Sequence, residues 1–351
     1  MKDKKNLLMI ATGLIVGAAA VLLVKLGNPA NMGFCIACFI RDIAGGLKLH
    51  NAAVVQYIRP EIIGLVGGAF ITALLKKDFA PKGGSSPVTR FILGFGVMVG
   101  ALVFLGCPLR MALRIAGGDM NAVVGLFGFV AGILAGVVFL KNGFSLGRTM
   151  RQSKLEGLTN VGINGFLLVL LVAFPALLVF STTGPASQKA PLMLALAAGL
   201  IVGAVAQRTR LCMVGGIRDV ILFKDWTLLM GFVAIIAVTL IGNFALGKFT
   251  LGFEGQPVAH TESLWNFLGM TAVGLGSVLL GGCPMRQLIL SGEGNTDSTV
   301  AVLGMAVGAA FCHNFGLASS GNGTTPAGRV ACLLTLAVMV IIAVANTKKK
   351  A

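Results

Sequence analysis

Long apolar runs recur along the whole chain and alternate with short polar segments. Many of them approach the roughly 20 residues that an α-helix needs to cross the hydrocarbon core of a bilayer. Several runs are shorter, which predicts tilted or broken helices. The pattern predicts an all-α polytopic membrane protein with about nine or ten transmembrane helices plus short re-entrant helices. The predicted spans lie near residues 6–26, 58–75, 91–106, 121–140, 163–180, 190–206, 226–247, 264–280, 298–313 and 328–346.

Composition supports this fold class. Hydrophobic residues make up 56% of the 351 residues and charged residues 11%, whereas a soluble domain carries roughly 25% charged residues. The spans leave no stretch for a soluble catalytic domain, so we predict a protein that is not an enzyme. We expect the first run, residues 6–26, to be kept as a span, because it is long for the apolar part of a signal peptide.

The formal net charge of +16 points to the orientation of the spans rather than to a nucleic-acid partner. Most of the 28 Lys and Arg residues, including Lys4, Lys5 and the lysines at 348–350, fall in alternate short segments between spans. Positive loops stay on the cytoplasmic side, which predicts a bacterial inner-membrane protein with both termini in the cytoplasm. Two further interpretations of the charge are contact with anionic membrane lipid and a pathway that favours anions.

Two cysteine motifs occur twice and in the same order. Gly33–Asp42 matches Arg210–Asp219 in the pattern Cys-x5-Arg-Asp, at an offset of 177 residues. Leu105–Arg110 matches Gly281–Arg286 in the pattern Gly-Cys-Pro-x-Arg, at an offset of 176 residues. Two ordered matches at nearly one offset predict an internal duplication.

The duplicated units are predicted to cover residues 1–180 and 181–351 of a single membrane domain. An odd number of spans in each unit would turn the second unit over in the membrane. Inverted repeats place their shared site near the bilayer midplane, where broken helices meet. The apolar, glycine-rich motif segments suit loops that dip back into the membrane.

The proline of Gly-Cys-Pro-x-Arg predicts where a helix begins. Proline favours the first position of a helix, so Pro108 and Pro284 would start helices with Cys107 and Cys283 at the preceding N-cap. Free backbone N–H groups and the positive end of the helix dipole would then surround each thiol and favour an anion. The alternative is a small residue before a helix-starting proline, with no ligand.

The arginine of this motif has two open roles. Arg110 and Arg286 would either give charge-assisted hydrogen bonds to an anion or pair with nearby acidic residues. A polar run follows each motif helix, and there Asp119 and Glu293 are predicted as turn or cap residues. The alternative is that these two carboxylates gate the path or neutralise a charge.

The Cys-x5-Arg-Asp motif predicts structural ion pairs. A charge inside a membrane is costly and needs either a partner or a function. Cys35 and Cys212 precede these pairs at equivalent places, and both are candidates for a thiol-lined path. We expect adjacent charges to pair and to pin re-entrant loops, Arg41 with Asp42 and Arg218 with Asp219.

The remaining cysteines and histidines carry weaker signals. Cys35-x2-Cys38 is a weak indication of a redox pair, because Cys38 has no counterpart in the second half. Cys312 and Cys332 are expected to pack as small apolar residues. The three histidines lack metal-ligand spacing and no nucleotide-binding loop occurs in the sequence. We therefore predict no metal, no cofactor and no ATP-driven pumping.

At these motifs the sequence resembles the YeeE/YedE family of sulfur-compound transporters, and within it the branch associated with selenium metabolism. The resemblance implies import of thiosulfate through an hourglass-shaped protein built from inverted repeats. It also implies that cysteines along the path relay the anion by S–H hydrogen bonds. That role falls on Cys35, Cys107 and Cys283, with Cys212 as the repeat equivalent.

The leading hypothesis is an importer of a small sulfur- or selenium-containing anion, along a path lined by the four motif cysteines and helix N-termini. One alternative is a membrane thiol–disulfide electron carrier, which needs two cysteines within bonding distance. Another is an accessory subunit of a sulfur or selenium pathway. The basic inner face further suggests docking of a cytoplasmic sulfur- or selenium-carrier protein.

Overall fold

The computed structural model describes residues 2–347 and is built almost wholly from helices. The described residues also form one two-stranded antiparallel sheet, in which β1 pairs with β2. The long helices are α1 (Lys2–Lys25), α3 (Pro60–Leu75), α4 (Pro87–Phe104), α6 (Met120–Lys141), α8 (Thr159–Ala173), α9 (Leu192–Thr209), α11 (Thr227–Ala245), α12 (Ser263–Leu280), α14 (Thr296–Asn314) and α15 (Pro326–Ala345). The short elements are α2 (Ile36–Gly46), β1 (Lys82–Gly83), α5 (Pro108–Ala116), β2 (Met150–Arg151), α7 (Lys154–Gly157), the 3-10 helix η1 (Pro175–Leu177), α10 (Met213–Phe223) and α13 (Pro284–Gly292).

The helices confirm the predicted all-α polytopic membrane fold. Within residues 2–347, seven helical segments are long and apolar enough to cross a bilayer, and α3 and α8 are shorter apolar helices. Large apolar side chains lie exposed on the outside of the bundle, for example Leu75, Phe127 and Ile341. An outer surface of this kind suits lipid rather than water.

One predicted span is wrong at its carboxyl end. The run at 163–180 corresponds to α8, which ends at Ala173 and is followed by the short 3-10 helix. Pro175 has no backbone N–H to continue the helical ladder, and Phe174 before it leaves the helical conformation with φ −130°. The apolar residues up to Phe180 therefore form an irregular connection.

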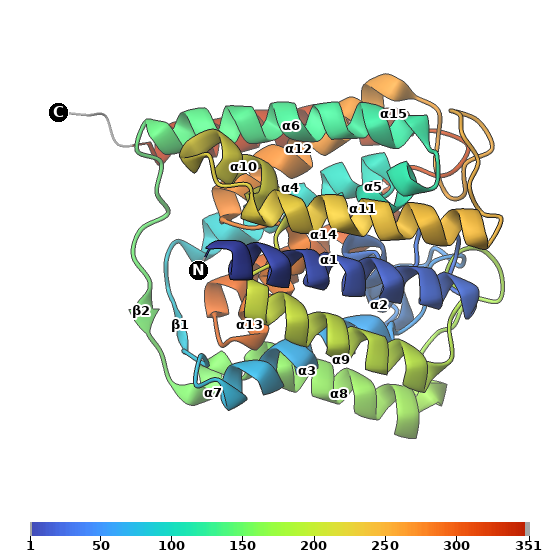
Figure 1. Ribbon diagram of the computed structural model, residues 1–351, viewed down its shortest axis with the longest axis horizontal. Helices are drawn as coiled ribbons and strands as arrows, with labels where there is room; N and C mark the ends of the chain where they lie inside the picture. Colours follow the sequence, from blue (N-terminus) through green and yellow to red (C-terminus); the bar gives the residue numbers. More distant parts are fainter. Residues whose placement is uncertain (1, 348–351) are drawn as a thin grey trace.

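The order of helices in the first half recurs in the second. α1 to α6 are followed, in the same order of long and short helices, by α9 to α14. The packing recurs as well: α1 contacts α11 as α9 contacts α3, and α6 contacts α12 as α14 contacts α4. α1 and α9 run in opposite directions (Figure 1), since Asn28 after α1 accepts a hydrogen bond from the backbone of Ala190 before α9. The assignment of the two units to residues 1–180 and 181–351 stays a prediction.

The long helices form two groups, and each group draws on both halves of the chain. α1, α3, α9 and α11 make one group, and α4, α6, α12 and α14 make the other. The four short motif helices lie between the groups, because each of them contacts both. In Figure 1, α2 and α5 lie toward the end opposite the amino terminus, and α10 and α13 toward the end that holds it.

Glycines bring paired helices from the two halves into main-chain contact. At the crossing of α3 with α9, a Cβ at Gly68 would collide with the carbonyl oxygen of Leu200, and one at Gly203 with that of Leu65. A Cβ at Gly132 of α6 would collide in the same way with Thr271 of α12. Small residues at intervals of four are the usual means by which membrane helices approach this closely.

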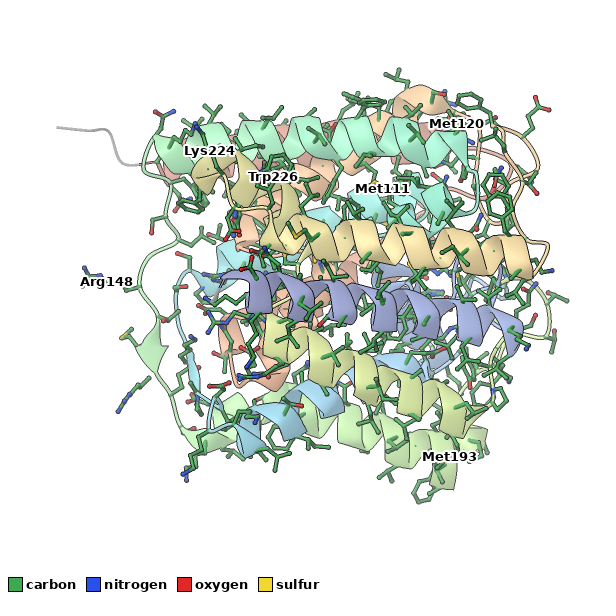
Figure 2. The ribbon with its side chains drawn as sticks, in the orientation of Figure 1. Met111, Met120, Arg148, Met193, Lys224 and Trp226 are labelled. Carbon is green, nitrogen blue, oxygen red and sulfur yellow. The ribbon has the colours of Figure 1, made fainter. Side chains whose placement is uncertain are left out.

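One end of the bundle holds both termini of the described chain. Thr347 pairs with Phe144 in an isolated bridge, and the sheet of β1 and β2 lies at the same end (Figure 1). Arg148 and Lys224 also lie toward this end, whereas Met120 and Met193 lie toward the other (Figure 2). The lysines at 348–350, which contributed to the predicted orientation, lie outside the described residues.

We predict that Gly203→Ala destabilises the protein and that Gly165→Ala does not. The added methyl group at Gly203 meets a backbone oxygen, whereas nothing lies within 4 Å of a Cβ at Gly165. Overpacking of this kind costs about 1–3 kcal/mol. Thermal unfolding in detergent, followed by size-exclusion chromatography, measures the difference. Equal midpoints for the two variants would contradict the role given to the glycine crossing.

Candidate functional site

The four motif cysteines each precede a short helix. Cys107 and Cys283 are the N-cap residues of α5 and α13, with Pro108 and Pro284 as the first helical residues. This is the arrangement that the Gly-Cys-Pro-x-Arg motif predicts. A backbone N–H near such an N-cap has no partner within its helix and points out of the helix end.

Cys35 and Cys212 are also N-cap residues, which the sequence reasoning missed. The Cys35 thiol accepts a hydrogen bond from the backbone N–H of Cys38 at 3.3 Å, at the start of α2. The Cys212 thiol accepts one from Gly215 at 3.4 Å, at the start of α10. The matching spacing of the two motifs was the available signal, but cysteine is not among the residues that usually cap helices.

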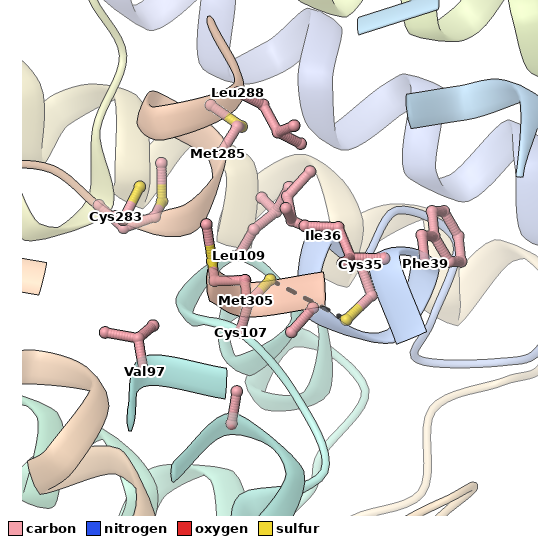
Figure 3. Packing of buried hydrophobic residues seen from close by; sticks show 14 of the residues in the cluster. Cys35, Ile36, Phe39, Val97, Cys107, Leu109, Cys283, Met285, Leu288 and Met305 are labelled. Atoms are coloured by element: carbon pink, nitrogen blue, oxygen red, sulfur yellow. Dashed lines mark hydrogen bonds between the residues drawn. The ribbon is translucent and has the colours of Figure 1, made fainter. Parts of the chain in front are cut away.

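The fold brings the cysteines together in two pairs. The Sγ atoms of Cys35 and Cys107 lie 3.9 Å apart and form a weak hydrogen bond (Figure 3). In the second half, the backbone N–H of Cys283 donates to the Cys212 thiol at 3.5 Å. Each pair therefore joins one Cys-x5-Arg-Asp motif with one Gly-Cys-Pro-x-Arg motif, and the ends of two short helices meet at each.

Both cysteine pairs are closed off from water. The four thiol residues are at most 6% exposed, with Cys212 the most accessible. Apolar side chains pack around them, including Leu109, Met285 and Met305 (Figure 3), each of them 1% exposed. An ion could pass between the pairs only if these side chains moved.

The first Arg-Asp motif forms a buried network of three charges. Asp42 is fully buried and pairs with Arg41 at 2.7 Å and with Arg59 at 2.8 Å. Arg59 also stacks over the ring of Phe39, with 4.6 Å from its guanidinium carbon to the ring centroid. Its remaining donors reach the backbone carbonyls of the connection before α9. The network thus ties α2 to the start of α3 and to the link between the two halves.

Arg59 is a residue that sequence reasoning missed. It lies directly before Pro60, which starts α3, whereas the sequence pattern placed it inside the predicted span 58–75 and gave it no role. Nearby, Glu61 is 1% exposed and accepts a hydrogen bond from Asn28 at 2.8 Å. An isolated charge at the edge of an apolar run was the only available signal for either residue.

The arginine and the aspartate of the second Arg-Asp motif form the expected ion pair, but at a more solvent-exposed position. Arg218 and Asp219 contact each other at 2.8 Å, and their side chains are 23% and 19% exposed. Among residues 2–347, no other charged side chain forms an ion pair with Arg218 or Asp219. Equivalent motifs therefore support a buried network in one half and a partly exposed pair in the other.

The two Gly-Cys-Pro-x-Arg arginines differ as well. Arg286 pairs with Glu293 at 3.0 Å, which is one of the two roles left open by the sequence. Arg110 is fully buried, and the hydrogen bonds of its guanidinium go to backbone oxygens and to the Cys38 thiol. Glu293 is therefore an ion-pair partner and not only a turn residue.

The arginine one turn further along α5 is neutralised. Arg114 is fully buried and pairs with Asp119 at 2.6 Å, while its guanidinium carbon lies 4.2 Å from the ring centroid of Phe104. Asp119 is also the N-cap of α6, where it accepts from the backbone of Asn121 at 2.9 Å. The predicted cap role of Asp119 is confirmed, and its pairing with Arg114 adds to it.

The helices and the four cysteine-capped helix ends define a polytopic helical membrane protein with paired thiol sites. The family model described as "Sulphur transport" matches residues 208–347, which include Cys212 and Cys283. The match supports the YeeE/YedE family that the motifs predict.

Two curated relatives extend this finding, and both are named thiosulfate transporter TsuA. The protein from Escherichia coli K12 is 33% identical over 104 residues, which is 30% of this chain and 29% of the relative. The protein from Spirochaeta thermophila is 31% identical over 119 residues, or 32% of this chain and 33% of the relative. The matched segments thus span about a third of these relatives, and they leave the selenium branch a prediction.

We predict that Asp42→Asn destabilises the protein far more than Asp219→Asn. Removing the charge of Asp42 leaves Arg41 and Arg59 buried without a carboxylate, and breaking a buried pair in this way costs about 3–5 kcal/mol. The partly exposed Arg218–Asp219 pair contributes about 1 kcal/mol or less. Thermal unfolding of the two purified variants tests this, and a comparable loss in both would disprove the structural role of the three-charge network.

Proposed function

We propose that the protein transports a small sulfur-containing anion of the thiosulfate class across a membrane. The observation that carries the proposal is the pairing of four cysteine thiols at the N-terminal ends of four short helices between two helix groups. The names of the matched relatives support the choice of anion.

Thiols and helix ends suit such an anion chemically. The S–H group is a weak donor and its sulfur is polarisable, which fits the soft terminal sulfur of thiosulfate. Backbone N–H groups and the positive dipole end at helix N-termini favour the charged oxygens. We call each cysteine pair, with the two helix N-termini that meet at it, a station. The two stations are Cys35–Cys107 and Cys212–Cys283, and the anion would pass from one to the other.

The buried thiols correspond to a closed state of this path. Movement of the two helix groups against each other would open one cysteine pair at a time, in the manner of transporters built from inverted repeats. We place the Cys35–Cys107 pair nearer the outer face of an inner membrane, with both termini in the cytoplasm. The basic inner end would then be the surface at which a cytoplasmic sulfur-carrier protein docks. Selenium-containing anions are the alternative substrate.

We predict that Cys107→Ser and Cys283→Ser each lower uptake by about tenfold or more, because a hydroxyl lacks the polarisable sulfur of a thiol. The assay is the entry of labelled thiosulfate into liposomes that contain only the purified protein. Cys332→Ala is the matched control, because Cys332 is a buried cysteine of α15 outside the motifs.

Parallel assays with sulfite and selenite identify the preferred cargo. No entry of any of the three anions with well-folded protein would reject transport by this chain alone and favour an accessory role. Wild-type rates in both serine variants would reject the thiol path while leaving transport in place.

A second candidate function is a thiol–disulfide carrier, which the 3.9 Å separation of Cys35 and Cys107 favours. Such a carrier cycles between two thiols and one disulfide, releasing two protons and two electrons to a disulfide-bearing partner. We predict instead that all seven cysteines stay reduced while the protein takes up thiosulfate. Mass spectrometry after rapid alkylation measures this, and a Cys35–Cys107 disulfide that forms and disappears during turnover would favour the carrier.

A further inference from the structure

Arg110 is a buried cation without a carboxylate. Its side chain is fully buried on the first turn of α5, and no Asp or Glu of the described residues lies within ion-pair distance of it. Nε donates to the carbonyl of Asn31, Nη1 to the carbonyl of Leu105 and to Cys38, and Nη2 to the carbonyls of Pro257 and Val258. These neutral partners hold the guanidinium in place but leave its charge uncompensated.

The other arginines of the motif helices are all compensated. Arg41 and Arg114 each contact an aspartate in the first half. Arg218 and Arg286 each contact a carboxylate in the second half. A buried charge in a membrane protein is expensive and marks a functional site unless a partner neutralises it. Arg110 is the exception that this rule singles out among these five residues.

The charge of Arg110 lies beside one cysteine pair. Its Nη1 is 3.5 Å from Cys38 Sγ, and the backbone N–H of Cys38 donates to Cys35 Sγ at 3.3 Å. Cys35 in turn contacts Cys107, which caps the helix that carries Arg110. At the other pair, the equivalent Arg286 is neutralised by Glu293.

We propose that Arg110 makes the Cys35–Cys107 pair the station that attracts and holds the anion, and that the Cys212–Cys283 pair is an electrostatically neutral station from which the anion leaves. The identity of the anion as thiosulfate rests on the proposed function, whereas the difference in charge between the two stations does not. Arg110 acts as a positioning charge through the field it creates at the thiols, because its N–H donors already bind protein atoms. The preference is set by fixed charge rather than by the shape of the path.

The test measures the electrostatic potential at each station by chemical labelling. One form of the protein keeps Cys107 as its sole cysteine and another keeps Cys283. Each is treated with an anionic and a cationic methanethiosulfonate of similar size. Reaction forms a mixed disulfide with the thiol and releases methanesulfinate, and the ratio of the anionic to the cationic rate reports the local charge.

We expect Cys107 to favour the anionic reagent and Arg110→Gln to lower this ratio by about tenfold, as expected for a unit charge several ångströms away in a partly desolvated site. Arg110→Lys keeps the charge and should retain the preference. Cys38→Asp places a carboxylate next to Arg110 without removing its backbone contacts, so it should abolish the preference even if Arg110→Gln folds poorly. At Cys283, the double variant Arg286→Gln, Glu293→Gln should leave the ratio unchanged.

Two results would overturn the proposal. One is an unchanged ratio at Cys107 in both Arg110→Gln and Cys38→Asp, and the other is a Cys107 thiol that neither reagent reaches. Uptake by the protein with all its cysteines separates this inference from the proposed function. In that assay Arg110→Gln should raise the KM for thiosulfate more than it lowers the maximal rate. A charge preference at Cys107 in a protein that moves no thiosulfate would reject the function and keep the site.

Discussion

Main-chain contact between helices of opposite halves is the constraint on which the rest of this structure depends. Glycines at positions such as Gly68, Gly132 and Gly203 let whole helices touch through their backbones. Larger residues there would push the paired helices apart, and with them the short helices packed between the two groups. The contacts within the two cysteine pairs are 3.9 Å and 3.5 Å long, so a small displacement of the short helices would break them. The geometry of the cysteine pairs therefore depends on glycines that lie away from the pairs, because these glycines have no side chain to hold the paired helices apart.

Short sequence patterns predicted those features of the site that depend on residues close together in the chain. A proline after a cysteine predicted the N-cap positions of Cys107 and Cys283, and adjacent opposite charges predicted the Arg41–Asp42 and Arg218–Asp219 pairs. The recurring apolar runs predicted the long helices, except where Pro175 ended α8 early. Each of these features depends on a few neighbouring residues.

Long-range partners could not be predicted in the same way. Arg59 lies 17 residues from Asp42 along the chain, and nothing in the intervening sequence indicates that they meet. Arg110 and Arg286 share their local pattern, yet within the described part of the chain Arg286 pairs with a carboxylate and Arg110 does not. That difference depends on how the chain returns after each short helix: Glu293 directly follows α13, whereas Asp119 near the end of α5 pairs with Arg114. Equivalent sequences thus acquire unequal electrostatics from their surroundings.

Each of the two helix groups contains helices from both halves of the chain, so neither half can complete its packing alone. α1 and α3 complete their packing only with α11 and α9, and α4 and α6 only with α14 and α12. A polypeptide that stopped in the connection after α8 would expose glycine-lined helix faces with no partner. Neither half is therefore a self-sufficient folding unit, and during synthesis the first would have to wait in the membrane for the second.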